Sequence, residues 1–206
     1  MSRIHQPKGP PLCYLCQQRP GTTRDHIPPR NLITDTVGAQ LITAPCCEQC
    51  RNQYRLDDEE FRNAVVLAAD PRTTGPVYQA MLRSFQQRPP IKASVLRRIH
   101  RSGNRAVFWP RDDAMTRVCE RIGRGLAYRK AKTLIPVNYR VDVMWNPIDV
   151  GPGLLAQAQV HGAIKEDFAY AGLIATENPA ISIWWMSFYK SSGAIVAFDA
   201  PECEST

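Results

Sequence analysis

Hydrophobic positions in the middle of the chain recur three and four residues apart, the spacing of one face of an amphipathic helix. One such stripe within residues 71–133 comprises Val77, Met81, Leu82 and Phe85. A second comprises Met115, Val118, Cys119, Ile122 and Leu126. Helix-breaking prolines separate the stripes at Pro71, Pro76, Pro89, Pro90 and Pro110. The pattern therefore predicts several short helices in this segment.

The last third of the chain, residues 134–206, changes to a period of two. Apolar residues alternate with polar ones at Val137, Tyr139, Val141, Val143 and Trp145, which predicts a half-buried strand. Residues 181–189 are β-branched and aromatic, and residues 194–198 follow after a short polar loop that contains Gly193. These two runs predict an antiparallel hairpin. His161 also falls in a predicted strand.

The first third, residues 1–70, has many loop-forming residues and ends in a predicted helix over 56–69. This helix begins with the acidic cluster, which we define as Asp57, Asp58, Glu59 and Glu60. Carboxylates in a first turn complement the positive end of the helix dipole. Together the three segments predict an α+β protein with the organisation 1–70, 71–133 and 134–206.

Charge also divides the chain into three parts, with the first boundary twelve residues later. Residues 1–82 carry nine Lys and Arg against eight Asp and Glu, residues 83–132 fourteen against three, and residues 133–206 three against eight. The middle, with a net charge of +11, is the electrostatic pattern expected of a polyanion binder. We expect the contacts to nucleic acid to come from Arg97, Arg98, Arg101, Arg117, Arg121 and Arg124. The alternative is an arginine-rich helix face that is simply solvated.

Composition sets the outer bounds. The chain has 206 residues, of which 44% are hydrophobic and 22% charged, values typical of a globular protein. No apolar run reaches the roughly 18 residues that a membrane span needs, and the N-terminus lacks a secretory h-region. Seven cysteines, an odd number, favour metal ligation over a disulfide scaffold. We expect a cytoplasmic protein without a membrane partner.

Two C-x-x-C pairs, Cys13 with Cys16 and Cys47 with Cys50, predict a structural zinc site. Each pair turns tightly enough to aim two thiolates at one point. Cys46 could take the place of Cys47, although the two-residue spacing favours Cys47. The alternative is a set of reduced, buried cysteines without metal.

Between and after the two pairs lie Arg24-Asp25-His26-Ile27-Pro28-Pro29 and Arg51-Asn52. This order of C-x-x-C, Asp-His-Ile-Pro-Pro, C-x-x-C and Asn resembles the zinc-containing HNH endonucleases. The resemblance covers about residues 13–62 and implies a ββα-metal module, in which a hairpin packs against a helix.

The resemblance also implies roles for matching residues. His26 matches the general base that takes a proton from the attacking water, a role that suits an imidazole. Asp25 and Asn52 match the ligands of a catalytic cation, Mg²⁺ or Mn²⁺. The second histidine of the family motif is absent, because no histidine occurs between His26 and His100. Asp57, Asp58, Glu59 or Glu60 could replace it with a carboxylate. Glu59 lies seven residues after Asn52, which predicts that the two share one helix face. The alternative is that this cluster is simply an acidic helix N-terminus.

These expectations lead to a metal-dependent endonuclease that hydrolyses phosphodiester bonds in DNA, in preference to RNA. Restriction, phage defence, a toxin and a mobile element all suit such an enzyme. One alternative is a non-catalytic, zinc-stabilised nucleic-acid binder. Another is a nuclease effector whose C-terminal segment binds a protein partner, a second copy or a signal. Trp145, Trp184 and Trp185 could stack on bases, but strand aromatics more often belong to a core.

Overall fold

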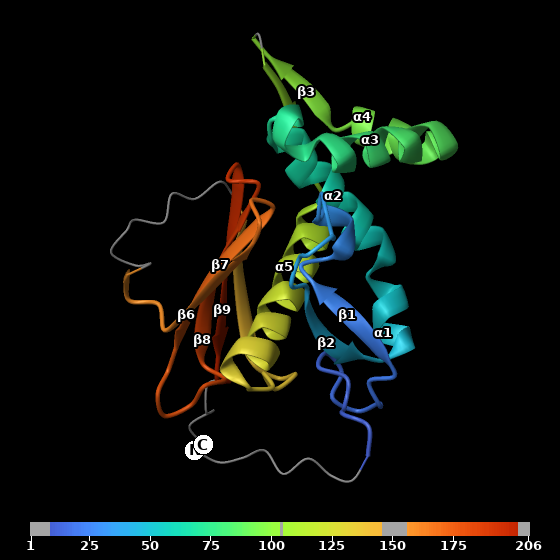
Figure 1. Ribbon diagram of the computed structural model, residues 1–206. Helices are drawn as coiled ribbons and strands as arrows, with labels where there is room; N and C mark the ends of the chain where they lie inside the picture. The colour runs from blue at the N-terminus through green and yellow to red at the C-terminus, as the bar shows by residue number, and fades with distance from the viewer. Residues whose placement is uncertain (1–8, 104, 146–155, 202–206) are drawn as a thin grey trace.

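The computed structural model describes residues 9–103, 105–145 and 156–201 and has an α+β architecture. A small hairpin with helices lies on one side, a five-stranded sheet lies on the other, and helix α5 runs between them (Figure 1). Among the described residues, no helix is long and apolar enough to cross a membrane.

The N-terminal part is a two-stranded antiparallel hairpin followed by a helix. Strand β1 (Thr23–Ile27) pairs with β2 (Ile42–Cys46), and the 3-10 turn η1 (Arg30–Leu32) lies in the connection between them. Helix α1 (Glu48–Gln53) follows β2 at once, and the Cys47 side chain caps its N-terminus by accepting a hydrogen bond from the Cys50 amide. The helix therefore begins directly after the first cysteine of the second C-x-x-C pair, which caps it.

The middle of the chain contains helices α2 (Arg55–Ala68), α3 (Pro71–Gln87) and α4 (Pro89–Leu96). Asp70 caps α3 through the Arg72 amide, and proline occupies a first-turn position of both α3 and α4, where no backbone donor is lost. The helix predicted over residues 56–69 is confirmed, since it corresponds to α2.

One part of the middle segment differs from the prediction. Residues 99–108 form a hairpin of β3 (Ile99–Ser102) and β4 (Arg105–Phe108) instead of a helix. Gly103, at the turn, has a φ of +59°, which L-residues with a side chain rarely adopt. This hairpin projects beside α3 and α4 (Figure 1).

Helix α5 (Asp112–Leu126) continues into a short π-helical turn, η2 (Ala127–Ala131), and is the central element of the fold. Glycines allow its close approach on both sides. A Cβ at Gly123 would lie 3.0 Å from the Phe198 ring of the sheet, and one at Gly125 would collide with the Ile27 side chain of β1. The helix is therefore tightly packed between the hairpin and the sheet.

The C-terminal sheet is antiparallel throughout, in the order β5-β9-β8-β7-β6. Its strands are β5 (Arg140–Trp145), β6 (Val160–Ile164), β7 (Phe168–Ile174), β8 (Ser182–Phe188) and β9 (Ser192–Asp199). The predicted hairpin of 181–189 and 194–198 is confirmed as β8 and β9. The strand predicted from Val137 begins later, at Arg140, and His161 lies in β6 as expected.

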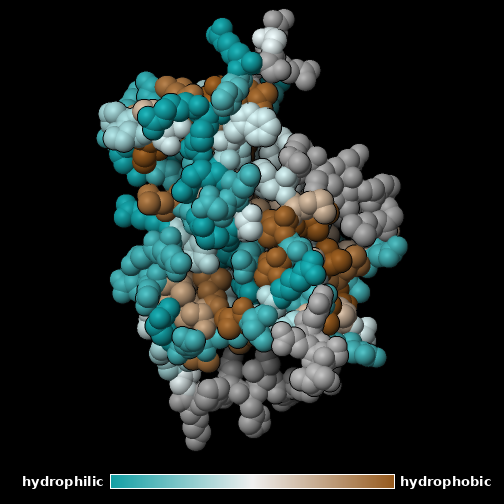
Figure 2. All heavy atoms as spheres, turned by 180° about the vertical axis from the view of Figure 1, so that it is seen from behind, coloured by the Kyte–Doolittle hydropathy of each residue, from teal (hydrophilic) through white to brown (hydrophobic). Residues whose placement is uncertain are grey.

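All three parts of the chain contribute to one hydrophobic core. Phe61 of α2 packs edge-on against Phe188 of β8 at 5.0 Å and against Trp145 of β5 at 5.2 Å. The same buried cluster includes Ile27 of β1 and Ile122 of α5. Seen from behind, the hydrophobic surface gathers mainly in the half that the sheet occupies (Figure 2).

Candidate functional site

Four cysteines from two separate segments meet in space. The sulfur atoms of Cys13, Cys16, Cys47 and Cys50 all lie within 4.8 Å of one another. Zn–S bonds of about 2.3 Å in a tetrahedron place sulfurs about 3.8 Å apart. The Cys16 and Cys47 sulfurs are 3.9 Å apart, close to that value. The donor set therefore fits a structural metal ion such as zinc.

Cys47, and not Cys46, belongs to this cluster. Cys46 is fully buried at the end of β2, with its sulfur 4.0 Å from that of Cys13, and donates to the Cys47 carbonyl oxygen at 3.4 Å. The alternation of side chains along β2 turns Cys46 inward, whereas Cys47 begins the helix. The preference for Cys47 from its spacing is confirmed.

Arg19 supplies a positive charge to the same cluster, and the sequence analysis did not identify it. Its Nε donates to the Cys47 sulfur at 3.2 Å, and its Nη2 donates to the Cys50 sulfur at 3.6 Å. Four thiolates around one divalent ion carry a net negative charge, so a guanidinium at this position stabilises the assembly. A basic residue inside the loop after Cys16 was the available signal.

Next to the cysteine cluster lies a pocket of about 530 Å³ at which Asp25 and His26 of β1 meet Asn52 of α1. These three residues were expected to act together, and the structure brings them to one pocket. Its lining is mostly basic, with the exposed side chains of Arg24, Arg30, Arg51 and Arg55 and with Arg121; the remaining lining residues are Pro29, Asn31 and Asp58. We call this the basic pocket.

Asp25 is only 8% exposed, and side chains of the protein interior hold its carboxylate in place. The Tyr14 hydroxyl donates to its Oδ2 at 2.5 Å, and Arg121 Nε lies 3.7 Å from the same oxygen. Tyr14 is itself the residue after Cys13 in the first cysteine pair. Among the described residues, Oδ1 has no hydrogen-bond partner, so this oxygen is available to a ligand.

His26 is half-buried beside Asp25. Burial lowers its pKa, and the neighbouring Arg30 lowers it further, against the opposing effect of Asp25. The imidazole is consequently neutral at pH 7, the form that can accept a proton. This protonation state suits a general base.

Arg121 is the most deeply buried arginine in the described part of the chain, only 2% exposed. It forms an ion pair with Asp58 and stacks on the Tyr54 ring at 4.8 Å. Burial raises the pKa of Asp58 to about 6, although Arg121 acts in the opposite direction. Arg121, which was expected to contact nucleic acid, instead turns inward, because it pairs with Asp58 of the acidic cluster.

Most of the arginines expected to bind nucleic acid have carboxylate partners. Arg98 pairs with Glu60, and Arg117 bridges Asp57 and Asp113. Arg124 is buried and pairs with Glu120. Arg97 and Arg101 are exposed, and among the described residues neither has an ion-pair partner. The acidic cluster of α2 thus neutralises much of the basic segment.

Glu59 does not line the basic pocket. The chain breaks its helix at Tyr54, so Asn52 belongs to α1 and Glu59 to α2, and the two do not share one helix face. Glu59 instead accepts hydrogen bonds from Ser84 at 2.6 Å and from Arg88. Asp58, one position earlier, is the acidic residue of α2 that lines the pocket.

Asp25 Oδ1 and the Asn52 side chain are oxygen donors of the type that Mg²⁺ accepts, with waters and substrate phosphate completing its shell. In the described part of the chain, only the four cysteines form a close group of three or more His, Cys, Asp or Glu ligands. The described residues of the basic pocket therefore do not form a closed cage for a cation. No protein-family model, curated protein or solved structure matches this chain.

Proposed function

We propose that this protein is a metal-dependent endonuclease of the HNH type that hydrolyses phosphodiester bonds, with DNA as substrate. One observation supports the proposal above all. An Asp-His pair from a β-hairpin and an Asn from the following helix line one pocket that exposed arginines surround. The adjacent four-cysteine cluster could hold a zinc ion that keeps hairpin and helix together.

In this mechanism His26 takes a proton from the attacking water, a role that its depressed pKa allows at neutral pH. Asp25 and Asn52 would hold the divalent cation, and Tyr14 fixes the orientation of Asp25. A cation held there would supply charge stabilisation at the scissile phosphate and at the departing oxygen. Arg24, which immediately precedes Asp25 and also lines the pocket, contributes further positive charge.

The exposed arginines of the basic pocket are better placed to contact phosphates than those of residues 83–132. Among the described residues, Arg24, Arg30, Arg51 and Arg55 form no ion pair, and all four line the pocket. Contacts of this kind position a duplex without reading its sequence. We therefore expect weak sequence preference and strong dependence of binding on salt.

Cleavage of supercoiled plasmid by the purified protein with Mg²⁺ or Mn²⁺ tests the proposal. His26→Ala should reduce nicking by about 10²–10⁴-fold while DNA binding and zinc content stay unchanged. His100→Ala is the matched control, since His100 is exposed on β3 and lies outside the pocket lining. Equal activity in the wild type and the His26 variant would refute the assigned mechanism.

A non-catalytic nucleic-acid binder is the second candidate, and one contact favours it. The guanidinium of Arg121 lies 3.7 Å from Asp25, where it competes with a cation for the carboxylate. A binder of this kind would shift DNA in a gel at low salt and cut none of it with any divalent ion. The plasmid assay combined with a gel shift separates the two functions.

A further inference from the structure

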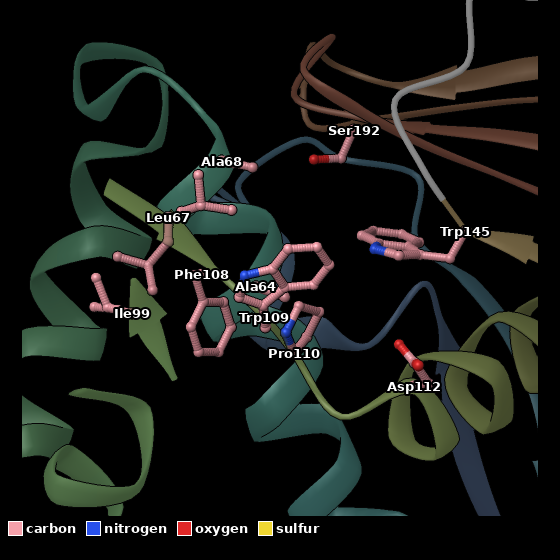
Figure 3. A pocket seen from close by; sticks show the side chains of 11 residues that line it. Ala64, Leu67, Ala68, Ile99, Phe108, Trp109, Pro110, Asp112, Trp145 and Ser192 are labelled. Carbon is pink, nitrogen blue, oxygen red and sulfur yellow. The ribbon is translucent and has the colours of Figure 1, made fainter. Parts of the chain in front are cut away.

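A second cavity, far from the cysteine cluster, has the chemistry of a binding site for a planar heteroaromatic ring. It has a volume of about 580 Å³ and lies where α2, the β3–β4 hairpin and the edge of the C-terminal sheet meet (Figure 3). A volume of this order is typical of small-molecule sites. We call it the tryptophan cavity.

Two indole rings define its centre. Trp109, which follows β4, is 62% exposed despite its size, and Trp145 of β5 faces it across the cavity (Figure 3). Trp145 is held in place from behind by Phe61 and Phe188, with ring centroids at 5.2 Å and 6.2 Å. One ring of the pair is therefore anchored in the core, and the other is accessible. Each of these indoles offers a face on which a flat ligand can stack.

Two polar groups lie on opposite sides of these rings. Ser192, the first residue of β9, lines the cavity, and among the described residues its hydroxyl has no hydrogen-bond partner. A hydroxyl can both donate and accept, so it is available to a ligand that binds there. Asp112, the first residue of α5, likewise forms no ion pair within the described part of the chain, and its carboxylate points toward the indoles (Figure 3).

We propose that the tryptophan cavity binds a nucleobase, with guanine preferred. The indoles stack on the base, the Asp112 carboxylate accepts hydrogen bonds, and Ser192 completes the contacts. An ionised carboxylate can only accept, and guanine offers it two adjacent N–H donors, one for each oxygen. Uracil and thymine offer one ring donor and no amino group.

This site is separate from the basic pocket. Asp58 of α2 lines the basic pocket, and Leu67 of the same helix lines the tryptophan cavity. Nine residues of helix correspond to about 14 Å along its axis. The base can belong to a free nucleotide or to an unpaired position of a strand, and the proposal does not depend on nuclease activity.

Binding of GMP, monitored by quenching of tryptophan fluorescence without added divalent cation, tests the proposal. GMP should bind about tenfold more tightly than IMP, which lacks the 2-amino donor, and than UMP. Trp109→Ala should weaken GMP binding about tenfold. Trp185→Phe is the control, because Trp185 lies on the sheet and outside the cavity lining.

Asp112→Asn should abolish the preference for GMP over IMP, whereas Asp113→Asn, one position along the helix, should retain it. Trp145 is part of the core, so Trp145→Phe is the variant of choice there, with stability measured in parallel. Binding of GMP that neither Trp109→Ala nor Asp112→Asn changes would overturn the proposal. Saturation by a quaternary ammonium such as choline, with no response to any nucleotide, would overturn it too.

A second arm distinguishes the source of the base. The His26→Ala variant is titrated with an oligothymidine that carries one central guanine and with the all-thymidine strand. If GMP and the guanine strand both bind, the site accepts free nucleotide. If GMP does not bind and the guanine strand binds more tightly than the all-thymidine strand, which the basic pocket also holds, the site reads a base within a strand. Absence of a guanine effect in both arms would refute the assignment.

Discussion

The protein has two arginine-rich regions, and they use the same side chain in opposite ways. At the basic pocket, Arg24, Arg30, Arg51 and Arg55 are exposed and, among the described residues, without ion pairs. Around α2, arginines from distant segments form ion pairs with the carboxylates of the acidic cluster, which neutralises their charge. The first set is free to contact a phosphate, and the second stabilises the fold. Density of positive charge along a sequence therefore does not show where free charge lies.

The largest expected effect is on the stability of the β1–β2 hairpin and α1, the elements that carry Asp25, His26 and Asn52. Cys47→Ser should lose the metal and with it most of the stability of the hairpin and α1, since structural zinc contributes folding free energy of about 10 kcal/mol. Cys46→Ser is the matched control and should retain the metal, because Cys46 lies outside the cluster. Metal content by mass spectrometry and thermal unfolding measure both. Full metal retention by Cys47→Ser would contradict the assigned ligand set.

The next largest effect on stability is expected at Arg121, the buried arginine that pairs with the acidic cluster. Arg121→Met should lower the free energy of unfolding by about 3–5 kcal/mol, because Asp58 is left without its charge partner. Arg55→Met, at the exposed rim of the pocket, should change stability by less than about 0.5 kcal/mol. Urea denaturation compares the two. Equal midpoints for both variants would remove the distinction between the regions.

The free arginines should dominate DNA binding. The double variant Arg24→Ala with Arg51→Ala should lower the slope of log affinity against log salt by about two. The double variant Arg111→Ala with Arg117→Ala, whose guanidiniums pair with Asp57, should change it much less. Fluorescence anisotropy over a series of salt concentrations gives the slopes. A larger change in the second double variant would reverse the comparison.

The smallest effect is expected where an ion pair lies fully at the surface. Arg72 pairs with Asp70 at 2.6 Å, but its side chain is 91% exposed. Arg72→Ala should leave both the free energy of unfolding and the salt slope indistinguishable from the wild-type values, because an exposed pair is screened by solvent. A loss comparable with that of Arg121→Met would show that burial does not explain the difference between the pairs.

Local patterns could be predicted from the sequence because their causes are local. The two-residue spacing of Cys47 and Cys50 was enough to choose Cys47 over Cys46, and period-two alternation was enough to find β8 and β9. The β3–β4 hairpin was missed although Gly103 provided a turn signal, because its strands are only four residues long.

Long-range pairing could not be predicted in this way. Arg121 and Asp58 are 63 positions apart, and nothing near either residue indicates the other. The same holds for the tryptophan cavity, where Trp109 and Trp145 come from different elements. A single position, Tyr54, ended α1 and removed Glu59 from the face on which Asn52 lies.

The Tyr14–Asp25 hydrogen bond has a consequence for how the protein matures. Tyr14 is part of the loop between Cys13 and Cys16, so its position depends on the same cysteines that could bind a metal ion. In a newly made chain with oxidised or unmetallated cysteines, Tyr14 would not be held in the position from which it orients Asp25. Under the proposed function, the enzyme would then become active only after it binds zinc. Thiol oxidants would inactivate it without modifying any residue that takes part in the reaction.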